Sequence, residues 1–320
     1  NTEMIKLFDA FAGYGGAHFA LKKAGLKHKA VGYSEILPDA IKIYDLNHPN
    51  STNFGDITEI NPDDLPDFNL FTGGFPCQPF SSAGDGLGEG DTRGTLFHDI
   101  LRIVKVKQPD NILLENVKGL LTKKHKHTLE TIRKKLINLG YFVHIELLNS
   151  KHYGIPQNRE RVWIYATKKE IPVIPIFSLA PDKIDLKKDI THFLDKKPDP
   201  ELYRSKKQID RLIEIHKMDF NVKKACCADV YNKKVRDDGI CITITEPHHN
   251  NMRIAEPPKN GELRVRKLSP EEHYRLMGFK DDEIEFGDLT YTQLCARAGN
   301  GWDINIASII FKNIYNFYYE

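Results

Sequence analysis

The sequence predicts an α/β protein with a mixed, mostly parallel sheet and a second, smaller domain. Short apolar runs alternate with helical patterns from residue 4 to residue 166, which is typical of βαβ units. A glycine-rich turn at Gly13, Gly15 and Gly16 follows the first apolar run, where open α/β sheets bind nucleotide-like ligands. From about Lys168 the alternation stops among prolines and lysines. We therefore expect an ordered first domain followed by an irregular one.

The alternating part of the chain supplies four strands and four helices. A further pair of strands, 142–148 and 161–166, is joined by a link too short for a helical crossover, so this pair should be antiparallel. Gly140 ends the helix before this pair, as glycine commonly does. The expected strands are Ile5–Phe8, Ala30–Ser34, Asn69–Thr72 and Asn111–Glu115, and the expected helices are Gly16–Ala24, Pro38–Asn47, Thr95–Val106 and His127–Leu139.

Order returns near the C-terminus. The segment 269–272 has the form of a capping box with proline at the first helical position, and it predicts a helix over 273–277. A final amphipathic helix over 303–318 carries an apolar face that needs a core to pack on. We expect this helix to complete the first domain. The predicted domains are therefore 1–167, 168–263 and 264–320, the last returning to the first.

Composition and charge exclude some classes of protein. The 46 basic residues nearly balance 44 acidic ones, but the charge is segregated: residues 118–135 hold seven Lys/Arg against Glu130 alone. Such a run is either a solvated helix face or a surface for a polyanion. The sequence contains no signal-type run and no stretch of about 18 apolar residues, so we expect a cytoplasmic protein without a membrane span. Five cysteines without CxxC spacing argue against a disulfide framework and a metal site.

Cys77 is the strongest candidate for a reactive residue. Pro76 fixes the backbone before it, polar residues follow it, and the glycine-rich segment 84–94 is suited to a mobile lid. A cysteine that merely packs as a small hydrophobe is the alternative. Glu115, at the end of an apolar strand pattern, supplies an acid that could polarise the target of a thiolate, although a salt-bridging carboxylate would also explain it.

Two further groups of residues suggest binding. Arg159 and Arg161 lie two residues apart, so on a strand they would point to one face and could grip a ring carbonyl or a phosphate, unless Glu160 only makes a surface ion pair. Glu35 follows the second strand, where a carboxylate can hold a ribose, and Asp56 could reach an adenine amino group. His18 stands where a dinucleotide site has its third glycine, so S-adenosylmethionine fits at least as well as NAD; a purely structural turn is the alternative.

These blocks, in this order, closely resemble the DNA (cytosine-5) methyltransferases of bacterial restriction-modification systems. The resemblance implies a Rossmann-like, S-adenosylmethionine-dependent methyltransferase sheet that contains an antiparallel strand pair, with a smaller irregular target-recognition domain at 168–263. The matching blocks are the Phe-Ala-Gly turn at Phe11, Gly74–Gln78, Arg93–Phe97, Glu115–Val117, Gln157–Arg161, Arg266–Glu272 and Gly299–Asn300.

The resemblance also implies a reaction. A methyl group would pass from S-adenosylmethionine to C5 of a flipped-out cytosine in a short duplex site, through a covalent adduct between Cys77 and C6, leaving S-adenosylhomocysteine. Glu115 would donate to N3, Arg161 would hold O2, and Arg159 would hold the base or its phosphate. The implied cofactor residues are Phe11, Gly13, Gly15, Glu35, Ile36, Asp56, Ile57, Pro76, Leu96 and Asn300, and the implied DNA contacts are Gln78, Ser81, Ser82, Arg93, Thr243 and Arg253.

Two departures from the family pattern concern the cofactor. Ile36 stands where many members have an aromatic residue against adenine, and Gly301-Trp302 replaces the small polar residue and valine that commonly follow Gly-Asn. Thr243 has a plain alternative, a threonine within a β-strand. The remaining expectations are double-stranded DNA as partner, a monomer, a bacterial cytoplasmic or nucleoid-associated location, and a cognate restriction endonuclease as companion.

Two other functions remain open on the sequence. An RNA (tRNA) cytosine-5 methyltransferase would share the architecture and the active-site residues. A catalytically silent DNA-binding regulator would share the fold, although the intact set of Cys77, Glu115 and Arg161 argues against it. An NAD-dependent dehydrogenase fits poorly because of His18.

Overall fold

The computed structural model describes residues 3–76, 92 and 95–319, and its chain forms two compact units. The first unit comprises Asn1–Leu148, Glu160–Pro181 and Ile306–Glu320. The second comprises Asn149–Arg159 and Asp182–Asn305. The chain therefore passes between the units four times, at 148/149, 159/160, 181/182 and 305/306.

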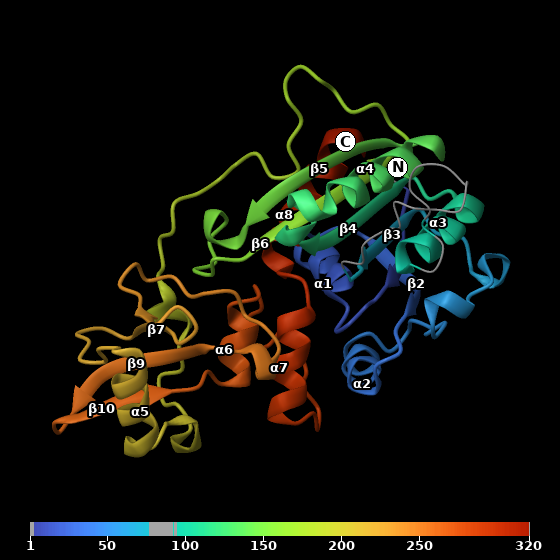
Figure 1. The fold of residues 1–320 in the computed structure, drawn as a ribbon. Coiled ribbons are helices and arrows are strands. Elements are labelled where there is room, and N and C mark those ends of the chain that lie inside the picture. The colour runs from blue at the N-terminus through green and yellow to red at the C-terminus, as the bar shows by residue number, and fades with distance from the viewer. Residues whose placement is uncertain (1–2, 77–91, 93–94, 320) are drawn as a thin grey trace. The chain divides into compact units, whose positions relative to one another are not determined.

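The first unit is built on a six-stranded sheet (Figure 1). The strand order is β2-β1-β3-β4-β6-β5, with parallel pairing of β1 with β2 and β3 and of β3 with β4, whereas β6 is antiparallel to β4. This confirms the predicted mixed, mostly parallel sheet with an antiparallel pair. The strands are β1 Ile5–Ala10, β2 His28–Ser34, β3 Leu70–Gly74, β4 Asn111–Val117, β5 Phe142–Asn149 and β6 Glu160–Thr167.

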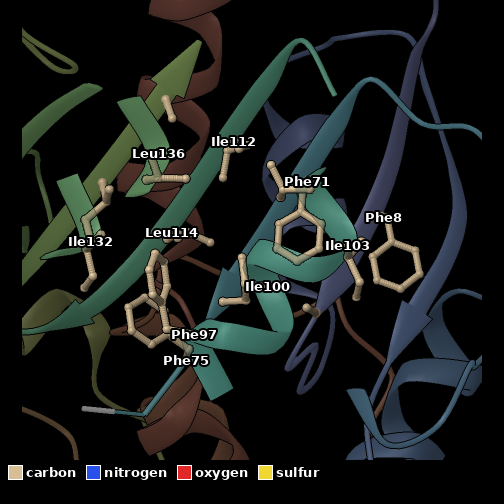
Figure 2. Packing of buried hydrophobic residues seen from close by; sticks show 14 of the residues in the cluster. Phe8, Phe71, Phe75, Phe97, Ile100, Ile103, Ile112, Leu114, Ile132 and Leu136 are labelled. Carbon is tan, nitrogen blue, oxygen red and sulfur yellow. The ribbon is translucent and has the colours of Figure 1, made fainter. Parts of the chain in front are cut away.

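Apolar side chains on one face of this sheet form its main core (Figure 2). Alternate residues such as Phe8, Phe71 and Leu114 point to this face, where they pack with Ile103 and Ile132 from two helices. On β4, Asn111 donates to the Tyr319 hydroxyl of the C-terminal helix (3.0 Å), which ties that helix to the first unit. The helices are α1 Gly16–Lys23, α2 Pro38–Asn47, α3 Leu96–Lys107, α4 Lys126–Asn138 and α8 Ile304–Tyr319.

The second unit contains a four-stranded antiparallel sheet that the sequence did not predict. Its order is β10-β9-β7-β8, and a small core that includes Ile209, Phe220 and Val265 packs with it. The capping box at Ser269 is present and begins α6. The elements are β7 Cys226–Asp229, β8 Lys234–Val235, β9 Met252–Lys259, β10 Glu262–Arg266, α5 Lys206–His216, α6 Pro270–Arg275 and α7 Tyr291–Asn300.

The compact units follow boundaries other than the predicted domains. Residues 264–305, which we assigned to the first domain, belong to the second unit, as does the short segment 149–159. Only α8, from Ile306 onward, returns to the first unit. The reason is packing, because Arg266 and Glu272 are fully buried partners within the second unit. The assignment of 168–263 to target recognition stays a prediction.

Within the described ranges, no helix combines the length and the apolar character needed to cross a bilayer. The same residues hold no group of three or more His, Cys, Asp or Glu arranged to bind a metal ion.

Candidate functional site

The turn between β1 and α1 has an unusual backbone. Phe11, Gly13 and Gly15 have φ angles of 52°, 54° and 84°, in the left-handed region that glycine adopts without a steric penalty. The Ala12 N–H donates to the Ser34 carbonyl (3.2 Å), and the Gly15 N–H donates to the Ala12 carbonyl (2.7 Å). The turn is therefore fixed to the end of β2.

Glu35 lies directly beside this turn. Its Oε1 accepts from the Gly13 N–H (2.9 Å), while Oε2 accepts from the N–H groups of Ile36 (2.8 Å) and Leu37 (3.1 Å). Oε1 keeps one further lone-pair site, so it can also take a ribose hydroxyl. Ile36 is 62% exposed, which leaves an apolar surface next to this carboxylate. The structure thus brings together four of the residues proposed for the cofactor, namely Phe11, Gly13, Glu35 and Ile36.

Asp56 and Ile57 lie next to the same edge of the sheet. The Ser34 hydroxyl donates to the Gly55 carbonyl (2.6 Å), which holds the 55–57 segment against the end of β2. Asp56 begins the 3-10 helix Ile57–Glu59, and hydrogen bonds from Thr58 lower the pKa of its carboxyl group. Its carboxylate is therefore ionised at neutral pH and suited to accept from an amino group.

Asp9 is a candidate site residue that the sequence analysis missed. It lies at the end of β1, is 3% exposed, and accepts a hydrogen bond from the Thr72 hydroxyl at Oδ1 (2.8 Å). Its Oδ2 is buried without a hydrogen-bond partner among the described residues. Burial, partly offset by Thr72 and reinforced by Glu35, raises the pKa of Asp9 to about 8. A carboxyl group in an apolar strand directly before a glycine turn was the signal available in the sequence.

These residues fit S-adenosylmethionine. A Cβ atom on Gly13 would meet nothing within 4 Å, so open space lies beside the turn. The acceptors around it, Glu35 and Asp56, match the hydroxyl and amino donors of an adenosine.

The other predicted cofactor residues are more dispersed. Pro76 is exposed after β3, and Leu96 is half-buried at the first position of α3, whose N-cap is Thr95. Asn300 belongs to the second unit, where it ends α7 and donates to Glu246 Oε1 (2.5 Å).

Glu115 and Arg161 meet on neighbouring strands of the first unit. Glu115 lies on β4, where its register partners are Gly74 on β3 and Trp163 on β6. Arg161 Nε lies 3.9 Å from Glu115 Oε1, and Glu115 is only 8% exposed. Pro76, the last described residue before Cys77, is two residues beyond Gly74. The strand order therefore brings the acid and the arginine to the edge of the sheet from which the cysteine segment departs.

Several predicted residues lie outside the described part of the chain. These are the nucleophile, the proposed lid apart from Thr92, and four DNA contacts, namely Cys77, the segments 81–91 and 93–94, Gln78, Ser81, Ser82 and Arg93.

Arg159 has partners different from those of Arg161, because β6 begins between them, at Glu160. Arg159 is 2% exposed and belongs to the second unit. Its guanidinium donates to the carbonyls of Ile244 (2.9 Å), Gly299 (3.0 Å) and Gly301 (3.1 Å). This geometry favours a positioning role within the second unit over the base-holding or phosphate-holding role that we predicted.

Thr243 and Gln157 hold neighbouring segments of the second unit together. The Thr243 hydroxyl donates to the Asn158 carbonyl (2.7 Å), and Thr243 lies outside any strand, contrary to the plain alternative. Gln157 accepts from the Ile244 N–H (3.0 Å) and donates to the Leu276 carbonyl (2.6 Å). Arg253 lies on β9 and is half-buried, and its guanidinium donates to the Met252 carbonyl (2.8 Å).

Comparison with known proteins gives consistent matches. The sequence profile described as C-5 cytosine-specific DNA methylase matches residues 5–316. The type II methyltransferase M.NgoBI of Neisseria gonorrhoeae is 35% identical over 315 residues, which cover 95% of this chain and 90% of that protein. M.NlaIV of Neisseria lactamica is 43% identical over 181 residues, or 53% of this chain, and this match spans only 43% of the relative.

Solved structures agree on the fold. The S. pombe Dnmt2 methyltransferase superposes with a TM-score of 0.76 at 23% identity, covering 99% of this chain and all of that one. A putative DNA modification methyltransferase encoded within an E. coli prophage superposes with a TM-score of 0.69 at 20% identity. At these identities the likeness concerns the fold alone.

Proposed function

Because the chain belongs to the C-5 cytosine-specific DNA methylase family, we propose that it transfers a methyl group from S-adenosylmethionine to C5 of a cytosine in duplex DNA. One observation carries the proposal: a buried Glu115 lies beside Arg161 at the edge of the sheet where the segment before Cys77 ends. Glu115 on β4 and Arg161 on β6 are two of the groups that the reaction needs, and β3, which pairs with β4, ends three residues before Cys77 in the sequence.

The reaction begins with activation of the ring. The Cys77 thiolate adds to C6 of the cytosine, and Glu115 donates a proton to N3, so that the electron pair of the C5–C6 double bond becomes nucleophilic at C5. Arg161 donates to O2 and holds the ring against Glu115. Cytosine C5 cannot be reached within a stacked duplex, so the base must be flipped out.

Bound S-adenosylmethionine supplies the methyl group as an electrophile. Carbon C5 attacks that methyl group, whose bond to sulfur breaks to leave S-adenosylhomocysteine. A base then removes the C5 proton, the electron pair of the C5–H bond restores the C5–C6 double bond, and the Cys77 thiolate leaves C6 with the electron pair of the C6–S bond while N3 returns its proton to Glu115. Glu35 and Asp56 orient the adenosine, while the turn 11–15 lies against it. Arg159 contributes indirectly, by fixing the 244 and 299–301 backbone.

The substrate and the partners follow from the same proposal. We expect a monomer that modifies a short specific site, read by side chains of 168–263 in a groove of the duplex. The type II relatives favour a role in restriction and modification, with a cognate endonuclease as companion. A cytoplasmic or nucleoid-associated location in a bacterium belongs to this proposal too.

Covalent trapping tests the proposal directly. Genomic-fragment duplexes containing 5-fluorocytosine, incubated with S-adenosylmethionine and wild-type protein, should yield a denaturation-resistant adduct, because fluorine at C5 prevents release of Cys77. Cys77→Ser should yield none, and a matched set of RNA fragments should yield none with either protein. No adduct with any DNA would overturn the proposal, and an adduct on RNA alone would replace it with an RNA methyltransferase.

A further inference from the structure

The second half of the glycine turn is held by a histidine from α2. Ser34 and Glu35 hold the first half of the turn at the end of β2 by accepting its N–H groups. Tyr14, in the second half, is contacted by a residue from another part of the chain. The Tyr14 carbonyl lies 3.1 Å from His48 Nε2. Because a carbonyl can only accept, the hydrogen of the imidazole must be on Nε2.

Neighbours on α1 and α2 fix the position of His48. It caps α2 through its N–H, which donates to the Tyr44 carbonyl (2.7 Å), and only 5% of the residue is exposed. Its ring stacks on His18 of α1 at 4.1 Å between centroids and meets the edge of Phe19 at 4.5 Å. The imidazole therefore cannot rotate away from the turn without disturbing α1 and α2.

The same contact explains why residue 15 is glycine. A Cβ atom there would lie 2.4 Å from His48 Nε2 and 2.9 Å from Tyr44 Cε2, which is closer than Cβ atoms approach other heavy atoms in proteins. At Gly13, in contrast, a Cβ atom would meet nothing within 4 Å. The two glycines thus have different purposes: Gly13 leaves room for a ligand, and Gly15 leaves room for His48.

Burial and the neighbouring histidines keep His48 neutral. His28 donates from Nδ1 to the Leu26 carbonyl (2.7 Å), so its Nε2 accepts from His18 Nδ1 (3.1 Å). Burial, together with the nearby His18, His28 and Lys22, lowers the pKa of His48 to about 3. The bond to Tyr14 is therefore one between neutral groups at ordinary pH.

We infer that His48 is a positioning residue for the cofactor turn, which it holds through the Tyr14 carbonyl in the conformation that binds S-adenosylmethionine. This inference rests on the proposed function and deepens it, because it extends the cofactor site from β1 and β2 to the end of α2. Loss of the Nε2 hydrogen leaves the Tyr14 carbonyl buried without that donor, and the 13–15 backbone loses its fixed orientation.

Binding of S-adenosylhomocysteine, measured by calorimetry, provides the test. His48→Gln places an amide nitrogen where Nε2 stands, since both atoms are four bonds from Cα, and it should bind within threefold of wild type. His48→Phe keeps a stacked ring without the donor and should bind about tenfold more weakly. The KM for S-adenosylmethionine should rise in the same ratio while kcat stays within twofold. If His48→Phe does not fold, His48→Asn, whose amide is too short to reach Tyr14, should show the same loss.

Tyr141→Phe is the matched control, because it removes a hydroxyl that donates to the Pro109 carbonyl (2.6 Å). Pro109 precedes the start of β4, whereas the cofactor turn follows the end of β1. It should leave the affinity for S-adenosylhomocysteine unchanged. Equal binding by wild type and His48→Phe, or an equal loss in His48→Gln, would overturn the inference alone. No binding by wild type would overturn the proposed function, and the inference with it.

Discussion

At the scale of single residues, the proposed reaction gives Glu115 the role of donating a proton to N3. Glu115→Gln keeps the size and most contacts of the side chain but supplies no such proton. We expect kcat to fall by at least about 100-fold, the usual contribution of a general acid, with the melting temperature nearly unchanged. Tritium transfer from labelled S-adenosylmethionine to duplex DNA measures this. Glu115→Gln with more than a tenth of wild-type activity would exclude the carboxyl group as the acid.

Asp9 makes a prediction about pH. Its pKa is about 8 in the folded protein and near 3.8 when exposed, so the folded state holds a proton that the unfolded state has lost. The resulting stability is present in full below pH 4 and is lost as the pH rises through 8.

Asp9→Asn mimics the protonated group and lacks this dependence. Relative to wild type, it should gain stability as the pH rises from 5 to 8, by up to about 1.4 kcal/mol per pH unit. Urea unfolding of both proteins at pH 5, 6.5 and 8 measures the difference. Parallel curves for the two proteins would mean that Asp9 is ionised in the folded state.

At the scale of elements, the start of β6 separates two arginines that look equivalent in the sequence. Arg159→Met should cost about 3 kcal/mol of stability, because three main-chain carbonyls lose a charged donor in a buried place. Arg161→Met should cost less stability but should lower kcat for cytosine methylation at least tenfold. Thermal unfolding and the methylation assay, applied to both variants, separate the two roles. The reverse pattern would show that Arg159, rather than Arg161, holds the base.

Local patterns predicted the elements of the first unit well. The predicted helices agree with α1, α2, α3 and α4 to within two residues at each end, because the apolar period and the caps are contained in each segment. The second unit was harder. β8 has two residues, and β9 contains Pro257 and Pro258, which argue against a strand when the sequence alone is considered.

The residues of the candidate site differ in the same way, since local sequence predicted some of them and not others. Motif residues such as Glu35, which follows a strand, and Glu115, near the end of one, could be assigned from that position. For Asp9 the sequence offered only its place before the glycine turn, because its hydrogen bond comes from Thr72, 63 residues later; for His48 it offered nothing, because the partner Tyr14 is 34 residues earlier. The contacts of Arg159 could not be predicted, because they depend on where β6 begins and on main-chain carbonyls up to 142 residues away. Long-range contacts of this kind are not written in any local pattern.

At the scale of the whole molecule, the basic run first noted in the sequence lies beside the candidate site. Residues 118–126 follow β4 directly as two 3-10 helices and the start of α4, and no acidic residue occurs from 116 to 129. Lys118 pairs with Glu160 (2.8 Å), whereas Lys123 and Lys124 are exposed and have no carboxylate partner in the described part of the chain. A duplex that brings a cytosine to Glu115 therefore meets unneutralised positive charge nearby.

The double variant Lys123→Gln/Lys124→Gln should weaken duplex binding about three- to tenfold at physiological salt and reduce the slope of log Kd against log salt by one to two units. Fluorescence anisotropy with a labelled duplex at several salt concentrations measures both. Lys27→Gln/Lys29→Gln removes the same charge at the opposite ends of the parallel strands and should change neither. Equal effects of the two double variants would show that only net charge matters.

Because the chain crosses between the compact units four times, only some exchanges of segments with a relative can change the specificity of this enzyme. The second unit is not one insertion but two, because 149–159 lies upstream of the remainder in the chain. A transplant of 168–263 from a relative would sever β10 between Leu263 and Arg264 and would leave Arg159 facing a foreign carbonyl at 244. Under the prediction that the second unit reads the target, a hybrid with a new target sequence has to carry both inserts together, which sets its breakpoints at 148/149, 159/160, 181/182 and 305/306.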